Sequence, residues 1–131
     1  MSRRCPEWGQ EVVCSSRFEA VADQGANLAL AASRLGVSTE VIGNVGEDAA
    51  GTRICRELGE VGIGLEEVET TPGGSTPMTI AAVRPDGERA FLCDLGCLKN
   101  FDSTAMARHW SGACEAKVVA LVGSSNLPSL D

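Results

Sequence analysis

The sequence predicts an α/β fold, in which helices pack on a sheet that contains parallel strands. The first observation is an alternation of segment types, because strand-like and helical runs follow one another between residues 11 and 64. The second is Lys117–Gly123 (KVVALVG), a continuous apolar run typical of a buried parallel strand. Together these patterns are typical of layered α/β proteins.

The first two segments are a strand-like run and a helix. Glu11–Val21 (EVVCSSRFEAV) mixes β-branched and polar residues with partial alternation, which predicts a strand with one covered face. Gly25–Leu35 has helical periodicity, and Gly36 supplies a C-terminal stop. The expected buried stripe of this helix has apolar residues at i, i+3, i+4 and i+7, namely Leu28, Ala31, Ala32 and Leu35.

The next two segments repeat this order. Thr39–Val45 is predicted to be a short strand, and Gly46 begins the turn that follows it. Asp48 is a suitable N-cap for a second helix, which is expected to run to about Val61. The residues expected to share the apolar face of this helix are Ala50, Ile54, Leu58 and Val61.

A β-hairpin is predicted in the middle of the chain. Thr76–Arg84 and Glu88–Cys93 are strand-like, and Pro85-Asp86-Gly87 between them is a tight-turn tripeptide. Glu11–Val21 is expected to pair with this hairpin, which would give a small antiparallel sheet apart from the main one. Further on, Phe101–Trp110 is expected to be a short helix with Asp102 or Ser103 as its cap.

Composition narrows the class of protein. The 131 residues form one domain or part of one, with 44% apolar residues and a net charge of −7. That charge disfavours nucleic acid and an anionic membrane surface as partners. No window approaches the roughly 18 apolar residues that span a bilayer. The start MSRRCPEWGQE lacks the apolar stretch of a secretory signal, so a cytoplasmic protein is expected.

The residues with metal-binding or catalytic side chains form no recognisable motif. None of the six cysteines is in a CxxC pair, so free and mostly buried thiols are expected, with no metal site. His109 is the single histidine, and a structural or solvated role is expected. The segment 66–72 contains three glutamates without calcium-loop spacing, so it is expected to be a solvated connection.

Four ordered blocks of this sequence resemble the signatures of the ribokinase-like (PfkB) carbohydrate kinase family. They are Gly25-Ala26-Asn27 with the helix that follows, Val41–Gly51 (VIGNVGEDAAG), Arg84–Phe91 (RPDGERAF) and Val118–Pro128 (VVALVGSSNLP). The resemblance implies part of a ribokinase-like three-layer αβα sandwich with a small antiparallel β lid. Residues 1–131 would form a single partial domain, with lid strands at about 11–21 and 76–93 and α/β core segments at about 25–64 and 98–131.

The resemblance also implies a sugar-binding site. In the family, the asparagine of the Gly-x-Asn turn binds substrate hydroxyls, and here that residue is Asn27, whose amide offers both a donor and an acceptor. Gly25 would let the ligand approach the backbone. The alternative is that Asn27 caps the helix and Gly25 serves only the turn. Asp23 stands where the family usually has glycine, and it would either obstruct the pocket or accept a sugar hydroxyl.

The catalytic machinery of the family has no counterpart in this sequence. The Gly-Ala-Gly-Asp motif, whose aspartate is the family's general base, is absent, and no strand with a substrate-binding aspartate precedes Glu11. ATP and Mg²⁺ are implied by the family alone, and no catalytic residue is assigned. The resemblance therefore predicts the sugar-binding and lid portion of an ATP-dependent carbohydrate kinase, inactive by itself.

Two alternatives stay open at this point. One is a non-catalytic module that binds sugar or self-associates, for instance as a homodimer through the lid or through exposed sheet edges. The other is a small α/β protein unrelated to kinases, whose glycine turns are only structural. A separate antiparallel lid would argue against this last alternative.

Overall fold

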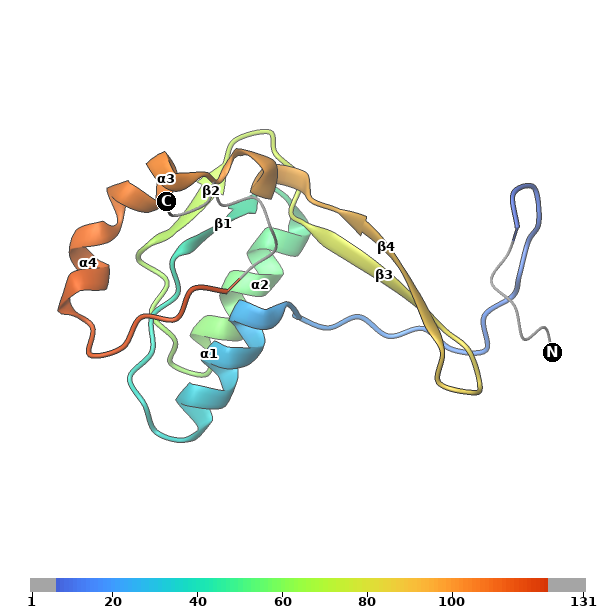
Figure 1. Cartoon of the computed structure of the whole chain (residues 1–131), viewed down its shortest axis with the longest axis horizontal. Coiled ribbons are helices and arrows are strands. Elements are labelled where there is room, and N and C mark those ends of the chain that lie inside the picture. The colour runs from blue at the N-terminus through green and yellow to red at the C-terminus, as the bar shows by residue number, and fades with distance from the viewer. Residues whose placement is uncertain (1–6, 123–131) are drawn as a thin grey trace.

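The computed structural model describes residues 7–122 and shows an α/β body from which a long β-hairpin projects (Figure 1). Two helices, α1 and α2, lie beside a short parallel sheet, and two further short helices follow the hairpin. In chain order the elements are α1 (Gln24–Arg34), β1 (Gly43–Gly46), α2 (Ala49–Gly59), β2 (Val68–Thr71), β3 (Met78–Val83), β4 (Arg89–Asp94), the 3₁₀ helix η1 (Gly96–Asn100), α3 (Ser103–Arg108) and α4 (Trp110–Glu115).

Helices α1 and α2 form where the sequence predicts them, but α1 buries a different face. Its buried residue is Ala29, which packs with Leu58 of α2 and with Ile63. Leu28 and Leu35 of the expected stripe are 46% and 83% exposed. The reason is that α1 carries a second apolar row, Ala26, Ala29 and Leu30, and periodicity alone cannot decide which row meets the core.

The parallel sheet contains a strand that the sequence analysis missed. β1 pairs with β2 in parallel, from Gly43 opposite Val68 to Gly46 opposite Thr71. The expectation of a solvated connection over residues 66–72 is therefore wrong. Its glutamates concealed the strand, because Glu67 and Glu69 pair with basic side chains from the end of α3 instead of facing only water.

The hairpin is confirmed, whereas the third strand expected beside it is wrong. β3 and β4 pair antiparallel from Met78 opposite Asp94 to Val83 opposite Arg89, and Gly87 in the turn has a φ of 88°. Residues 11–21 contain no strand, and Phe18 is 89% exposed. The polar stretch Cys14–Arg17 interrupts the alternation, so this segment has no continuous apolar face to bury against the hairpin.

The last described elements agree with the sequence in one respect and differ in another. Asp102 caps α3, since its Oδ1 accepts from the backbone N–H groups of Thr104 and Ala105 at 3.0 Å each. The strand expected at Lys117–Gly123 does not form over residues 117–122, where Val118 is 83% exposed. A strand needs a neighbour, and neither described sheet offers one to this segment. Gly123 lies outside the described residues.

The cysteines that the structure describes are unpaired, as expected, but most are not buried. Cys97 is buried, whereas Cys14, Cys93 and Cys114 are exposed. Their elements explain this, because the hairpin that carries Cys93 is exposed along both strands.

None of the helices within residues 7–122 combines the length and apolar character that crossing a bilayer requires.

Candidate functional site

The three residues predicted to bind substrate gather at the start of α1. Asp23 is the N-cap residue, and its carbonyl oxygen accepts from the backbone N–H of Asn27 at 3.0 Å. Asn27 therefore lies inside the first turn and does not cap the helix, so the capping alternative is wrong. Its side chain is exposed and has no hydrogen bond to another described residue. An exposed amide at this place is available to a polar ligand.

Gly25 lets another segment of the chain pack closely against the start of α1, and its backbone conformation does not require glycine. Its φ is not positive, and a Cβ built on it would lie 3.1 Å from Cγ2 of Val122 and 3.7 Å from Oδ2 of Asp23. The start of α1 and the end of the apolar segment 117–122 therefore lie against each other. This contact brings together two of the blocks that carry the family resemblance.

Asp23 has a backbone conformation that ordinarily requires glycine. Its φ is 96° and its ψ is 156°, and among residues 7–122 it is the one non-glycine residue with positive φ. This region is essentially restricted to glycine and costs an L-residue on the order of 1–3 kcal/mol. Its exposed carboxylate lies beside the helix N-terminus, where negative charge is favoured.

A second polar group joins the hairpin to the body. The Asp48 carboxylate accepts from Thr76 N and Thr76 Oγ1 at 2.7 and 2.6 Å, and from Gly51 N at 2.8 Å. Thr76 Oγ1 in turn accepts from Gly46 N at 2.9 Å. These bonds lower the pKa of Asp48, chiefly through the Thr76 hydroxyl and backbone N–H. Thr76 is 6% exposed, so the end of β1, the start of α2 and the root of β3 meet in one buried contact.

Glycines make this contact possible. A Cβ on Gly46 would lie 2.5 Å from backbone atoms of Ser75 and Thr76, and one on Gly51 would lie 2.9 Å from Thr76 Oγ1. A Cβ on Gly96 would overlap the carbonyl oxygen of Ser75. Backbone atoms cannot move aside easily, so these positions exclude any side chain. We call the contacts of Gly46, Asp48, Gly51, Thr76 and Gly96 the hairpin base.

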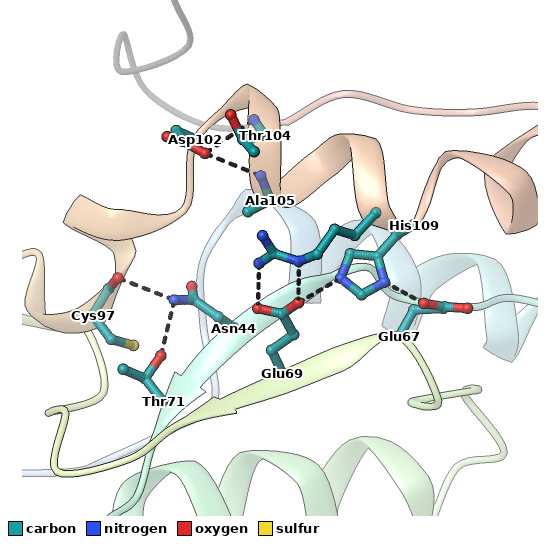
Figure 2. Close-up of polar contacts among 10 residues, drawn as sticks. Asn44, Glu67, Glu69, Thr71, Cys97, Asp102, Thr104, Ala105 and His109 are labelled. Atoms are coloured by element: carbon teal, nitrogen blue, oxygen red, sulfur yellow. Dashed lines mark hydrogen bonds and ion pairs between the residues drawn. The ribbon is translucent and has the colours of Figure 1, made fainter.

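Asn44 connects the body to the segment that follows the hairpin. Its Nδ2 donates to Cys97 O at 3.0 Å and lies 3.4 Å from Thr71 Oγ1 (Figure 2). Its Oδ1 is buried without a hydrogen-bond partner among the described residues. Asn44 thus links β1 to η1, the segment that follows β4. Thr76 and Asn44 were not singled out from the sequence, and the available signal was their position beside glycines in the Val41–Gly51 block and the hairpin loop.

A cluster of charged side chains lies where β2 meets the end of α3. His109 lies between Glu67 and Glu69, with Nδ1 against Glu67 Oε2 and Nε2 2.9 Å from Glu69 Oε1 (Figure 2). Arg108 pairs with both Glu69 oxygens, at 3.1 and 2.9 Å. The pKa of His109 is raised by the Glu67 and Glu69 contacts, and the pKa of Glu69 is lowered by Arg108 and then His109. The expected structural role of His109 thus has a defined set of partners.

Comparison with known proteins identifies the family. The model of pfkB family carbohydrate kinases matches residues 23–131, which is most of the chain. This chain belongs to the pfkB family of carbohydrate kinases. The alternative of an unrelated α/β protein is therefore wrong, in keeping with the separate antiparallel hairpin.

Individual relatives show how much of a pfkB protein is present. The chain is 35% identical over 89 residues to the ATP-dependent ribose-1-phosphate kinase of Halopiger xanaduensis, covering 68% of this chain and 30% of that enzyme. It is 33% identical over 67 residues to fructokinase-2 of Solanum lycopersicum, covering 51% of this chain and 20% of the relative. The chain thus spans less than a third of the length of these two relatives.

A solved structure confirms the ribokinase-like fold. The ribokinase of Giardia lamblia superposes with a TM-score of 0.75 at 20% identity, covering 87% of this chain and 37% of that one. The part of the fold described for this pfkB chain is therefore a parallel sheet with its helices and an antiparallel strand pair.

The described residues of this pfkB chain form no metal-ion cluster, and side chains already cap two of their helix N-termini. The family implies ATP and a metal ion, and open backbone N–H groups at a helix N-terminus are one arrangement that binds phosphate. In α2, the N–H of Gly51 is occupied by Asp48, and in α3 the first N–H groups are occupied by Asp102. Within residues 7–122 no three acidic, cysteine or histidine side chains are arranged to hold a metal ion.

Proposed function

We propose that this chain provides the sugar-binding and lid portion of an ATP-dependent carbohydrate kinase. The observation that carries the proposal is the placement of two features on one side of the body. Helices α1 and α2 both begin at the side from which the hairpin projects (Figure 1). Asn27, which is exposed, therefore lies in the first turn of a helix that begins on the side of the body that carries the hairpin.

Sugar recognition in this proposal rests on Asn27 and Asp23. The Asn27 amide can donate to one hydroxyl and accept from its neighbour, which suits the vicinal hydroxyls of a sugar. The Asp23 carboxylate is exposed one turn earlier and can accept a further hydroxyl. Gly25 between them lies against Val122, so it lets the start of α1 pack on that segment and is not assigned a ligand contact. The relatives act on a ribose phosphate and on fructose by their names, so the proposal is limited to the sugar class.

Phosphoryl transfer in this proposal needs groups beyond the described residues. ATP and Mg²⁺ would be held by such groups, because Asp48 and Asp102 already cap α2 and α3 and no metal-ion cluster lies within residues 7–122. Residues 7–122 alone are expected to bind sugar weakly and to transfer no phosphate. A cytoplasmic location is part of the same proposal.

The test is a sugar titration of the ¹⁵N-labelled chain followed by NMR. Ribose and fructose are the probes, and the Asn27 side-chain amide should shift with either sugar in a saturable way. The Asn27→Ala variant should lose saturable binding, whereas Gln24→Ala, an exposed amide removed from the same turn, should retain it. Equal binding by both variants would contradict the assignment, and ATP-dependent phosphorylation by the purified chain would contradict its inactivity.

A second candidate function is self-association through the hairpin. All residues of β3 and β4 are exposed, including five large apolar ones: Met78, Ile80, Val83, Phe91 and Leu92. Opposite residues of an antiparallel pair share a face, so Ile80 and Leu92 form one apolar patch and Ala81 and Phe91 another. A two-stranded ribbon with apolar side chains on both faces is marginal alone and gains from a partner.

Light scattering after size-exclusion chromatography tests self-association. The chain should elute as a dimer, and Ile80→Lys should convert it to a monomer because a buried charge is costly at an apolar interface. Thr79→Lys is the matched control on the opposite face of β3 and identifies which face is used. A monomeric wild-type chain at high micromolar concentration would exclude this function.

A further inference from the structure

His109 lies between two hydrogen-bond acceptors. Its Nε2 is 2.9 Å from Oε1 of Glu69, and its Nδ1 contacts Oε2 of Glu67 (Figure 2). An ionised carboxylate can only accept, so both ring nitrogens must carry a proton for both bonds to form. Only the imidazolium form satisfies this geometry. The side chain is 11% exposed, so water does little to replace a lost bond.

The surrounding charges balance only when His109 is protonated. The carboxylates of Glu69, in β2, and Glu67, just before β2, face His109. Arg108 of α3 contacts Glu69, and the negative charge of Asp102 also raises the pKa of Arg108. In the described part of the chain, α4 contributes no ion pair to His109. Arg108 and protonated His109 together match the two glutamates. When the imidazole is neutral, one of the two negative charges has no counterpart.

The segment held by these contacts has little apolar anchorage of its own. His109 is the residue between α3 and α4, and the buried residues of these two helices are Ala105 and Ala113. Alanine buries few methyl groups, so packing alone fixes the segment weakly. The helices α3 and α4 lie on the side of the body away from the hairpin (Figure 1).

We propose that protonated His109 is a pH-sensitive latch that holds the α3–α4 segment on β2 and loosens that hold when the proton is lost. The latch is separate from sugar binding and does not depend on the proposed function. The fixed part of the latch is the pair of carboxylates that accept from the imidazolium. The part that moves is the segment Ser103–Glu115.

The pH range of the latch follows from the direction of each pKa. The pKa of His109 is raised above 6.5, first by the hydrogen bond to Glu67 and then by that to Glu69. Its contribution is therefore complete below about pH 6.5 and is lost as the pH rises through the raised pKa. The pKa of Glu69 is lowered below 4.5, chiefly by Arg108, so the latch also opens as the pH falls below that range.

Hydrogen exchange and a histidine titration of the full chain test the latch. Since His109 is the single histidine, its Cε1–H resonance reports one titration and should have a midpoint above about 6.5. Amides of Ser103–Glu115 should lose protection across that midpoint, about tenfold for each pH unit by which the midpoint is raised. Amides of α2 serve as the internal reference and should keep theirs after correction for intrinsic exchange.

Single substitutions separate the latch from a general pH effect. Glu67→Gln and Glu69→Gln should each lower the His109 midpoint, whereas Glu66→Gln, which removes an exposed neighbouring charge, should leave it nearly unchanged. His109→Gln should make protection of Ser103–Glu115 independent of pH in the neutral range. A His109 midpoint at or below about 6.5 would overturn the latch. Equal pH dependence of protection in His109→Gln would overturn it as well.

Discussion

The carboxylate of Asp48 holds Thr76 by two hydrogen bonds at once, one from its backbone N–H at 2.7 Å and one from its hydroxyl at 2.6 Å. Asp48 is also the N-cap of α2. A single side chain therefore starts the second helix and fixes the root of the hairpin. Asp48, which follows β1 in the glycine-rich Val41–Gly51 block, therefore fixes how the hairpin is attached to the body.

Removing the Thr76 hydroxyl should destabilise the fold. Thr76→Val keeps the shape of the side chain but leaves Gly46 N without its buried acceptor and removes one bond to Asp48. We expect a loss of about 1–3 kcal/mol in the free energy of unfolding by urea. Thr79→Val, on the exposed hairpin, should change it by less than about 0.5 kcal/mol. Similar losses for both variants would contradict a special role of Thr76.

The glycines of the Val41–Gly51 block should differ sharply in tolerance. A Cβ on Gly46 meets backbone atoms of Ser75 and Thr76 at 2.5 Å, whereas a Cβ on Gly43 meets nothing within 4 Å. Gly46→Ala should therefore lower the free energy of unfolding by about 3 kcal/mol, because the backbone must shift. Gly43→Ala should be neutral or slightly stabilising. A stable, well-folded Gly46→Ala variant would show that the hairpin base can expand.

Asp23→Gly should stabilise the chain. It relieves a positive φ of 96°, a cost of about 1–3 kcal/mol, against an unfolded-state entropy cost of about 0.4–1 kcal/mol. The expected net gain is about 1 kcal/mol in the free energy of unfolding. Ala22→Gly has no such strain to relieve and should destabilise the chain. Thermal melts of the two variants in parallel measure this, and equal effects would refute the strain at Asp23.

Acid should weaken the hairpin base through Asp48. Its pKa is lowered from 3.8, so its contribution is present above about pH 3.8 and is lost as the pH falls through the lowered value. Asp48→Asn should be less stable than the wild type near neutrality, and the gap should close in acid. Urea unfolding of both proteins over this range measures the gap. A gap that stays constant with pH would exclude the ionised carboxylate as its source.

The sequence predicted the elements whose signals are local. The caps at Asp48 and Asp102 and the turn at Pro85-Asp86-Gly87 each act within a few residues, so α2, α3 and the hairpin could be placed from neighbouring residues alone. The start of α1 was also predicted to within one residue, at Gly25 where the structure has Gln24. Short-range chemistry of this kind is present in the sequence itself.

Features that depend on a distant partner were predicted poorly. β2 was missed because two glutamates, Glu67 and Glu69, suggested a solvent-exposed loop. Their partners, Arg108 and His109, are about 40 residues away in the sequence. The run at 117–122 has the composition of a buried strand but no strand beside it among the described residues. Thr76 is an ordinary residue in the sequence, and only the fold brings it to Asp48. Whether a segment forms a strand or buries a side chain depends on the segment that packs against it, and the sequence of one segment alone does not identify that partner.

The two ends of the hairpin meet. The carbonyl of Ser75, just before the hairpin base, accepts from the backbone N–H of Cys97 at 2.8 Å, just after it. The chain thus leaves the body and returns to it at one point, as it would at the neck of an inserted module. A ribbon attached in this way can lengthen, shorten or be exchanged between relatives while the body beneath it keeps its connections. The hairpin can therefore change in length or sequence without altering the start of α1, where Asn27 lies.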